Sequence, residues 1–379
     1  MIIAILYALN VICVLYLCIY IAGYFTKRNS EAAGQNKKLS IIIPFRNEGK
    51  RILKCLKSIK KQKGVKISKV VLVDDNSSDN YKKILRAKIK NFSFPIKIVH
   101  KTDGVGSIAD SIKLGCRYVK TKIVAVVTAD VILTRNALRE CIKYVGRNRA
   151  VSCIVDPLPG KGLMHKVSSI DKIFRQRFLQ KSRSNLNLTP NLVGAFYLIH
   201  KDKIKQMKKS FVEDLLLTYK LYSMKNTIYI VPKRLAYEEE KNSLLTIINQ
   251  KIRYSMGNIG GLVKGIDAII RSPEISWSIG LFSYQILWYL LPLVVVFDII
   301  ALLFTSKVLY LFLLIFSMWQ ITIFLALSDY KRYCIADIPN QIVYSILYPP
   351  VMLISIFLSL IFIVRNGGTF FETVKLYSR

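Results

Sequence analysis

LSIIIPFRNE (residues 39–48) and KVVLVDDNSSD (residues 69–79) show one pattern twice, an apolar run followed at once by a polar turn. PIKIVH (Pro95–His100) and KIVAVVTAD (Lys122–Asp130) repeat the apolar run. Short apolar runs bounded by turn residues indicate strands, and helical patterns lie between these four. Strand–helix units in succession predict an α/β domain, a parallel sheet with helices on both faces.

The polar residues just after these strands are the candidates for function, because ligands of such sheets bind at the carboxyl ends of the strands. Pro44–Glu48 follow the first strand, Asp74–Asp79 the second and Thr128–Val131 the fourth. Farther along, Glu213-Asp214 open an apolar helical pattern, and Gln250–Tyr254 close the domain. Each fragment alone also fits an ordinary role as a helix cap, a first-turn carboxylate or a solvated helix residue.

The 379 residues carry 57 Lys+Arg against 23 Asp+Glu, a net charge of +34. This excess fits an anionic membrane surface, a phosphorylated substrate, nucleic acid, or Lys-rich solvated faces without a partner. Long apolar segments make the membrane a better partner than nucleic acid, and no nucleic-acid partner is expected. The seven cysteines form no CxxC pair, which fits a reduced domain that faces the cytosol.

Four apolar segments predict membrane helices. Ile2–Tyr24 is long enough for one crossing and too long for the core of a cleaved leader, and the basic flank after it places the next domain in the cytoplasm. Ile279–Phe304 and Val308–Leu327 predict a helical hairpin, in which Asp298 should face protein or water and not lipid. Ile342–Val364, interrupted by two prolines, is either a kinked span or a short interfacial piece followed by a strained crossing.

These patterns divide the chain into an N-terminal anchor (1–25), a cytoplasmic domain (37–257), an amphipathic interfacial segment (258–278), a C-terminal membrane region of about three spans (279–365) and a tail (366–379). The basic helical pattern of residues 163–184 is expected to pack on the membrane interface or to grip phospholipid, with no part in catalysis.

Taken in order, the motifs resemble those of the membrane-embedded family 2 glycosyltransferases of the GT-A (Rossmann-like) fold, which include cellulose, chitin and hyaluronan synthases, poly-N-acetylglucosamine synthases and ceramide-type glucosyltransferases. IIIPFRNE resembles the opening strand of that family and VDDNSSDN its VDDGSxD motif, and TADV stands at the DxD position. VEDLLLTYKLY resembles the helix that carries TED, and QKIRY resembles Q(Q/R)xRW. The match runs over residues 39–258.

The resemblance implies a UDP-sugar donor and the following roles. Asp130 would hold Mg²⁺ or Mn²⁺ against the donor diphosphate, as hard oxygen ligands do. Asp214 would be the general base for the acceptor hydroxyl, with Glu213 as the second catalytic carboxylate, and Tyr254 and Gly194 would contact the acceptor. The donor contacts would be Pro44, Arg46, Glu48, Asp74, Asp75, Ala129, Gln250 and Arg253.

Two positions depart from the family pattern. Thr128 replaces the first Asp of DxD and leaves one carboxylate for the metal, and Tyr254 replaces Trp but keeps an aromatic surface. The expected function is an inverting membrane glycosyltransferase that forms a β-linkage at the cytoplasmic membrane face, in polysaccharide synthesis. Two alternatives stay open. One is an enzyme that transfers a single sugar to a lipid or polyprenyl-phosphate acceptor, and the other is a non-catalytic subunit that binds sugar nucleotides. A polymer product would call for a homodimer or a partner subunit, because three or four spans are few for a conduit.

Overall fold

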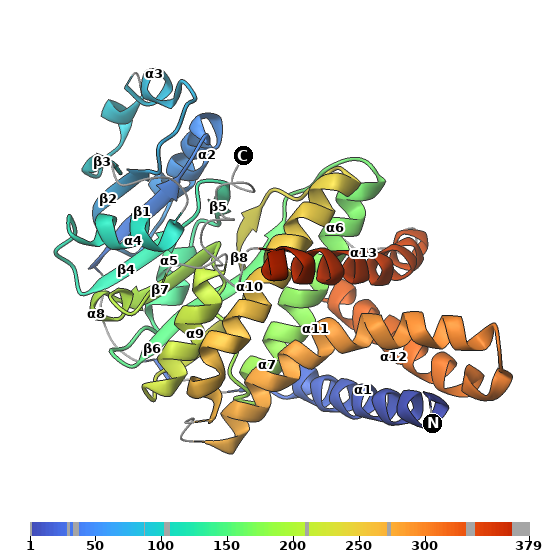
Figure 1. Cartoon of the computed structure of the whole chain (residues 1–379). Helices are drawn as coiled ribbons and strands as arrows, with labels where there is room; N and C mark the ends of the chain where they lie inside the picture. The colour runs from blue at the N-terminus through green and yellow to red at the C-terminus, as the bar shows by residue number, and fades with distance from the viewer. Residues whose placement is uncertain are drawn as a thin grey trace.

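The computed structural model describes residues 2–28, 31–32, 38–86, 88–101, 107–208, 212–270, 274–330 and 338–365. The predicted tail, 366–379, lies outside the described residues. An α/β body surrounds one sheet, and long helices extend away from it (Figure 1).

Among the described residues, eight strands form one mixed sheet in the order β3-β2-β1-β4-β7-β6-β8-β5. Their bounds are β1 Lys38–Phe45, β2 Lys66–Asp74, β3 Ile96–His100, β4 Ile123–Val127, β5 Val131–Leu133, β6 Arg149–Pro157, β7 Phe196–His200 and β8 Thr227–Glu238. Neighbours from β3 to β4 are parallel, as predicted, whereas β7 is antiparallel to both β4 and β6. The parallel sheet predicted from the first four strands is therefore confirmed, and the later strands make the whole sheet mixed.

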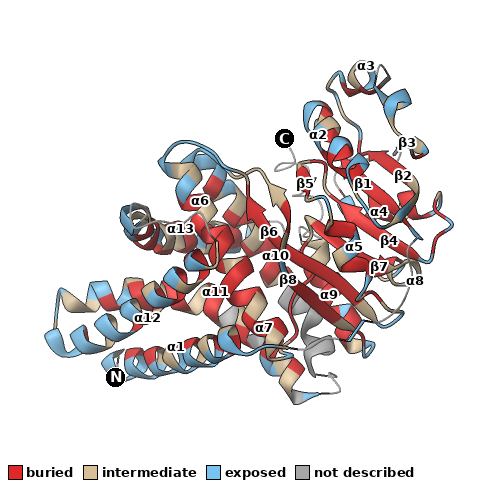
Figure 2. Ribbon diagram, turned by 180° about the vertical axis from the view of Figure 1, so that it is seen from behind, coloured by how far each residue is buried: buried red, intermediate tan, exposed pale blue. Residues whose placement is uncertain are grey.

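The core of the body consists of the strand residues and the helices that cover them. β1, β4 and the second half of β2 are almost wholly buried, as their unbroken apolar runs require (Figure 2). The covering helices include α2 Gly49–Lys60, α3 Tyr81–Arg86, α4 Ile108–Cys116, α5 Ala137–Ile142, α8 Lys201–Ile204 and α9 Glu213–Ser223. α4 lies close to β1 because Gly115 has no Cβ, which would stand 2.7 Å from Ile42 Cγ2.

The direction of strand addition reverses beside β1. β2 and β3 lie on one side of it and β4 on the other, so the carboxyl ends of β1 and β4 are neighbours at a switch point of the sheet. In open α/β sheets, the loops at such a point separate and leave a crevice for a ligand.

The long helices are α1 Ile2–Phe25, α10 Leu244–Ile270, α11 Ile275–Leu302, α12 Leu309–Ser328 and α13 Ile338–Arg365. In the part of the chain that the structure describes, three segments are long and apolar enough to cross a membrane: Ile3–Phe25, Ser306–Ser328 and Ile338–Arg365; Leu287–Leu302 is a shorter apolar helix. Their outer faces expose large apolar side chains such as Leu15 and Phe357 (Figure 2). These features fit association with a membrane.

Three predictions about the long helices can be compared with the structure. Asp298 is buried, and its Oδ1 accepts a hydrogen bond from Asn10 Nδ2 at 3.0 Å, so the prediction that it faces protein is confirmed. Pro349-Pro350 lie inside the single helix α13, which favours the kinked span. The segment 258–278 is not a separate element, because α10 continues without a break from Leu244 to Ile270 and α11 begins at Ile275.

A further helical segment joins the two parts of the molecule. It consists of α6 Leu163–Ile173, the π-helix η2 Phe174–Gln180 and α7 Lys181–Asn185. Its apolar face, with Ile170 and Phe178, belongs to the core of the long helices. One face of the segment thus packs against the long helices, and the predicted packing on the membrane interface or binding of phospholipid stays a prediction.

Candidate active site

A cavity of about 790 Å³ opens at the switch point of the sheet. Its wall is formed by the loops after β1 and β4, the start of α9, the end of β8, α10, α11 and the segment α6–η2. Of the predicted site residues, those in the wall are Pro44, Arg46, Glu48, Asp75, Ala129, Asp130, Gly194, Glu213, Asp214, Gln250, Arg253 and Tyr254. Residues that are up to 210 positions apart in the sequence thus meet at one cavity, and only Asp74 is not part of its wall.

The cavity concentrates acidic side chains in a basic protein. Eight of the 23 acidic residues line it: Glu48, Asp75, Asp130, Glu213, Asp214, Glu238, Glu239 and Glu240. Six basic residues stand among them: Arg46, Arg51, Lys172, Arg175, Lys241 and Arg253. Such close packing of opposite charges is typical of sites that bind charged ligands and cations, and it does not follow from an overall charge of +34.

Hydrogen bonds connect the loop after β1 to the loop after β2. Asn47 adopts φ 56°, and this left-handed conformation lets its backbone N–H donate to Ser77 Oγ at 2.9 Å while its side-chain Oδ1 accepts from the Ser78 N–H at 2.8 Å. The Gly49 N–H donates to Asp79 Oδ2 at 2.8 Å. These bonds fix the loop that carries Arg46 and Glu48 at the cavity.

Asp74 and Asp75 have different surroundings although they are adjacent. Asp75 lines the cavity and forms an ion pair with Lys101 Nζ at 2.9 Å. Asp74 points away from it and accepts hydrogen bonds from the Ser77 N–H and the Tyr81 hydroxyl, both at 2.8 Å, beside His100. Burial raises the pKa of Asp74, but the hydrogen bonds from Ser77, His100 and Tyr81 outweigh it and lower the pKa overall. The donor contact expected of Asp74 stays a prediction, and its carboxylate is turned from the cavity because successive side chains of a strand face opposite ways.

Asp130 stands where the sequence places a metal ligand. Burial, followed by the negative charge of Glu238, raises the pKa of its carboxyl to about 6. Within the described ranges, no group of three or more His, Cys, Asp or Glu residues could hold a metal ion. A magnesium-type ion does not require such a group, because it is commonly held by one or two carboxylates together with substrate phosphates. The acidic surroundings of Asp130 fit a divalent cation of this kind.

Glu213 and Asp214 form a half-buried pair of carboxyls at the start of α9. Asp214 accepts the Gly194 N–H at 3.0 Å and the Leu215 N–H at 2.9 Å, which stabilise its ionised form. Burial raises the pKa of both carboxyls, and the charge of Asp214 raises that of Glu213 further. Within the pair, the two backbone N–H donors favour the ionised form of Asp214.

The predicted residues of α10, which are Gln250, Arg253 and Tyr254, contact one another at the cavity. The Arg253 guanidinium lies 5.3 Å from the centroid of the Tyr254 ring, and the Arg175 guanidinium lies 5.8 Å from it. Gln250 Nε2 donates to the Tyr254 hydroxyl at 3.3 Å. Residues four apart lie on one face of a helix, which explains how Gln250 and Tyr254 reach the same cavity.

The segment α6–η2 supplies residues that sequence reasoning missed. Lys172, Arg175, Gln176 and Gln180 line the cavity, although the basic pattern of 163–184 predicted no role there. The π-helix, whose hydrogen bonds run from residue i to i+5, widens the turn and is often found at functional sites. The basic pattern of 163–184 did not indicate which of its residues would face the cavity and which the long helices.

Comparisons with known proteins agree with this arrangement. Residues 40–207 match the family model described as Glycosyl transferase family 2. Glycosyltransferase GlyG of Streptococcus pneumoniae is 27% identical over 107 residues, which are 28% of this chain and 35% of that protein, so the match spans about a third of the relative.

One solved structure shows the same fold. The mannosyltransferase PcManGT from Pyrobaculum calidifontis, solved in complex with GDP-Man and Mn²⁺, has a TM-score of 0.66 and 17% identity over 94% of this chain and 97% of that chain. TarS of S. aureus (residues 1–349) aligns over 62% of this chain and 66% of that chain with 18% identity and a TM-score of 0.40. The first of these supports the GT-A fold for the α/β body together with its long helices.

Proposed function

The chain carries a family 2 glycosyltransferase domain, and from this premise we propose that it is an inverting enzyme that transfers a sugar from a nucleotide donor to an acceptor hydroxyl beside Asp214. The observation that carries the proposal is the meeting of Asp75, Asp130, Asp214 and Arg253 at one cavity. The expected donor is a UDP-sugar and the expected bond is β, formed at the cytoplasmic face of a membrane.

Each side chain has a role in such a reaction. Asp75, at the carboxyl end of β2, faces the part of the cavity where the nucleoside would bind. A bound Mg²⁺ or Mn²⁺, held at Asp130, would neutralise charge on the leaving diphosphate. Arg253 and Arg175 place guanidinium groups in the same wall, and such groups stabilise phosphate oxygens.

Asp214 acts as the general base. Its carboxylate is fixed by two backbone N–H groups, so it can accept the proton of the acceptor hydroxyl without first reorienting. Attack by that hydroxyl on the face opposite the diphosphate inverts the anomeric carbon, and an α-linked donor gives a β-linked product. Glu213, when protonated, leaves a single negative charge at the point of proton transfer.

The test uses the full chain purified in detergent with UDP-glucose, UDP-galactose, UDP-N-acetylglucosamine and GDP-mannose, each with Mg²⁺ or Mn²⁺. Release of nucleoside diphosphate is the measurement. Asp214→Asn should lower turnover by about 10²–10⁴-fold, the usual contribution of a general base. Asp202→Asn, which removes an exposed carboxylate of α8, serves as the control and should keep full turnover.

Full turnover in Asp214→Asn would refute the assignment of Asp214 as the base. If the unmodified chain released no nucleoside diphosphate from any donor, the proposal that it is an enzyme would be refuted. The size of the product decides between a polymer and a single transfer, and its anomeric configuration by NMR decides whether the reaction inverts.

A further inference from the structure

Arg175 on η2 offers two unbonded nitrogen atoms to the cavity that it lines. Its Nε donates to Asp171 Oδ2 at 3.0 Å, whereas neither Nη1 nor Nη2 has a hydrogen-bond or ion-pair partner among the described residues. The side chain is 18% exposed, and in the described part of the chain the buried nitrogens without a partner include Arg183 Nη1 but not these two. A ligand in the cavity can therefore reach them. Their N–H donors form a planar fork that matches the oxygens of a phosphate group.

A buried carboxylate fixes the direction of this fork. Asp171 stands four residues before Arg175, on the same side of the helix, and is 4% exposed. Burial raises the pKa of its carboxyl, but the charges of Arg175 and Lys251 outweigh it and lower the pKa. Asp171 is therefore ionised when it accepts the Nε–H bond, and a bond between two charged groups is stronger than a neutral one.

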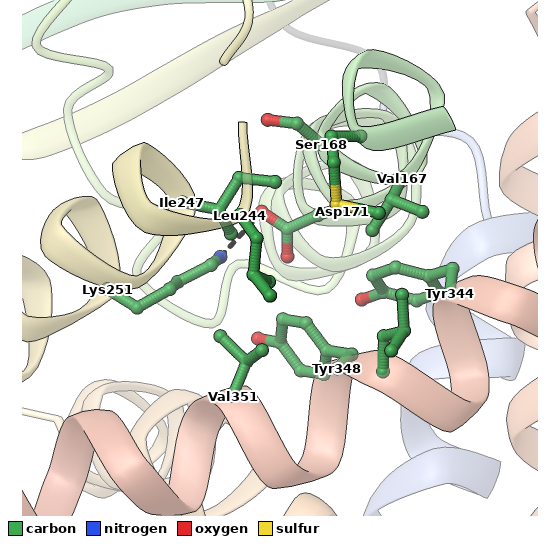
Figure 3. A pocket seen from close by; sticks show the side chains of 11 residues that line it. Val167, Ser168, Asp171, Leu244, Ile247, Lys251, Tyr344, Tyr348 and Val351 are labelled. Atoms are coloured by element: carbon green, nitrogen blue, oxygen red, sulfur yellow. Dashed lines mark hydrogen bonds and ion pairs between the residues drawn. The ribbon is translucent and has the colours of Figure 1, made fainter. Parts of the chain in front are cut away.

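Lys251 of α10 binds the same carboxylate but does not line the cavity. Its Nζ donates to Asp171 Oδ2 at 2.7 Å and lies 5.0 Å from the centroid of the Tyr348 ring. Figure 3 shows Asp171 and Lys251 facing each other, with Tyr344 and Tyr348 of α13 beside them. Contacts from α10 and α13 thus hold Asp171 in the orientation in which it bonds to Arg175.

The Arg175 fork lies in the part of the cavity where the proposed reaction takes place. The Arg175 guanidinium is 5.8 Å from the centroid of the Tyr254 ring, and the Arg253 guanidinium is 5.3 Å from the same centroid. Burial raises the pKa of Asp214, and its backbone hydrogen bonds and then the charge of Arg253 oppose this rise, so Arg253 is also near the base. Two guanidinium groups therefore stand beside one ring in the wall that contains the base.

We propose that Asp171 is a positioning residue that holds Arg175 ready to bind a phosphate group of the substrate. The inference rests on the proposed function, because the donor of that reaction carries a diphosphate and one of the alternative acceptors carries a phosphate. Asp171 does not line the cavity, so it acts through Arg175. A guanidinium that is already oriented loses less conformational freedom on binding, and its affinity for phosphate is higher for that reason.

The experiment uses the full chain purified in detergent. It measures the affinity for UDP and for GDP by titration calorimetry with Mn²⁺, and the KM values for the accepted nucleotide sugar and for farnesyl phosphate. Arg175→Met removes the fork, and Asp171→Asn keeps the fork but removes the charge that orients it. Lys251→Met is the matched control, because it removes the other cation from the same carboxylate and leaves the bond to Arg175.

We expect Arg175→Met to weaken binding of the phosphate ligand about ten- to a hundredfold, as the loss of hydrogen bonds to a charged group does. Asp171→Asn should weaken it about three- to tenfold, and Lys251→Met should leave it within about twofold. The double variant Asp171→Asn/Arg175→Met should bind no more weakly than Arg175→Met alone, because Asp171 acts through Arg175. A loss confined to the nucleotide assigns the phosphate to the donor, and a loss confined to farnesyl phosphate assigns it to the acceptor.

Unchanged values for both ligands in Arg175→Met would overturn the proposal. So would losses that add in the double variant, or equal losses in Lys251→Met and Asp171→Asn, because these results indicate a structural role for the whole cluster. If Asp171→Asn does not fold, the change is made in the Lys251→Met background, where it leaves one buried cation without its partner and not two. Failure of the proposed function looks different, because the unmodified chain would then release no nucleoside diphosphate from any donor, and this inference would fall with it.

Discussion

At the scale of single residues, the site depends on short contacts between the backbone and one carboxylate. Gly194 lies so close to Asp214 that a Cβ on it would stand 2.7 Å from Asp214 Oδ2. The glycine therefore gives its N–H to the base and leaves room for it at the same time. The acceptor contact expected of Gly194 remains a prediction, and the structure adds this positioning role.

We expect Gly194→Ala to lower turnover while the protein stays folded. The new methyl group must displace the Asp214 carboxylate, and loss of the N–H bond raises the pKa of that carboxyl. Because the base acts in its ionised form, the acidic limb of the pH profile of kcat/KM should move to higher pH. Gly115→Ala, which crowds the core and not the base, is the control, and a profile that shifts equally in both variants would contradict the assignment.

At the scale of elements, η2 joins the sheet to the long helices through buried charges. Arg177 donates from Nε and Nη2 to the two oxygens of Asp156 on β6, at 2.9 and 2.6 Å, and its Nη1 lies 3.3 Å from Asp329 Oδ2 at the end of α12. Asp156 is fully buried and Arg177 is 5% exposed. This ion pair fixes the rotation of the π-helix and hence the direction in which Gln176 points.

Asp156→Ala should lower the free energy of unfolding by about 3–5 kcal/mol, because it leaves the Arg177 charge buried without its main partner. The double variant Asp156→Ala/Arg177→Met should recover much of this loss, since it removes the charge as well. Denaturation in detergent, followed by circular dichroism, measures both. A double variant no more stable than the single one would show that the charge of Arg177 is not the cause.

At the scale of the whole molecule, the long apolar helices and the cavity are parts of one packed unit. α1 packs against α7, α11 and α12, and α7 directly follows η2, which lines the cavity. Figure 1 shows α1 and α12 extending together from the body. α1 comes close to α7 at Gly23, where a Cβ would stand 2.6 Å from Leu186 Cδ1 and 2.9 Å from the Ser182 carbonyl oxygen.

Gly23→Ala should therefore lower the melting temperature, with a loss of about 1–3 kcal/mol as is usual for overpacking. Thermal unfolding in detergent is the measurement. Ile19→Ala, on the exposed face of the same helix, is the control and should change the stability in detergent little. Equal effects of the two changes would mean that α1 does not dock at Gly23.

The sequence predicted the first four strands and the apolar helices correctly, because each leaves a local pattern, whereas the roles of the residues at the strand ends stay predictions. It could not predict that β7 enters the sheet antiparallel between β4 and β6, since pairing direction depends on a partner far along the chain. It also could not separate Asp74 from Asp75. Two adjacent carboxylates cannot be told apart from the sequence until the faces of the sheet are known. In the structure, Asp74 bonds to the Tyr81 hydroxyl, whereas Asp75 pairs with Lys101 at the cavity.

The periodicity of apolar residues, a property of neighbours in the chain, was enough to determine the α/β class and the long apolar helices and to predict a site at the ends of the strands. Only the tertiary structure decided which face of the segment α6–η2 meets the cavity, and so brought Gln176 to the same wall as Trp288 of α11. The physical reason is that an amphipathic helix specifies two faces but not their partners. The apolar face finds α1 and α12 only when distant parts of the chain pack, and that packing turns the polar face toward Asp214.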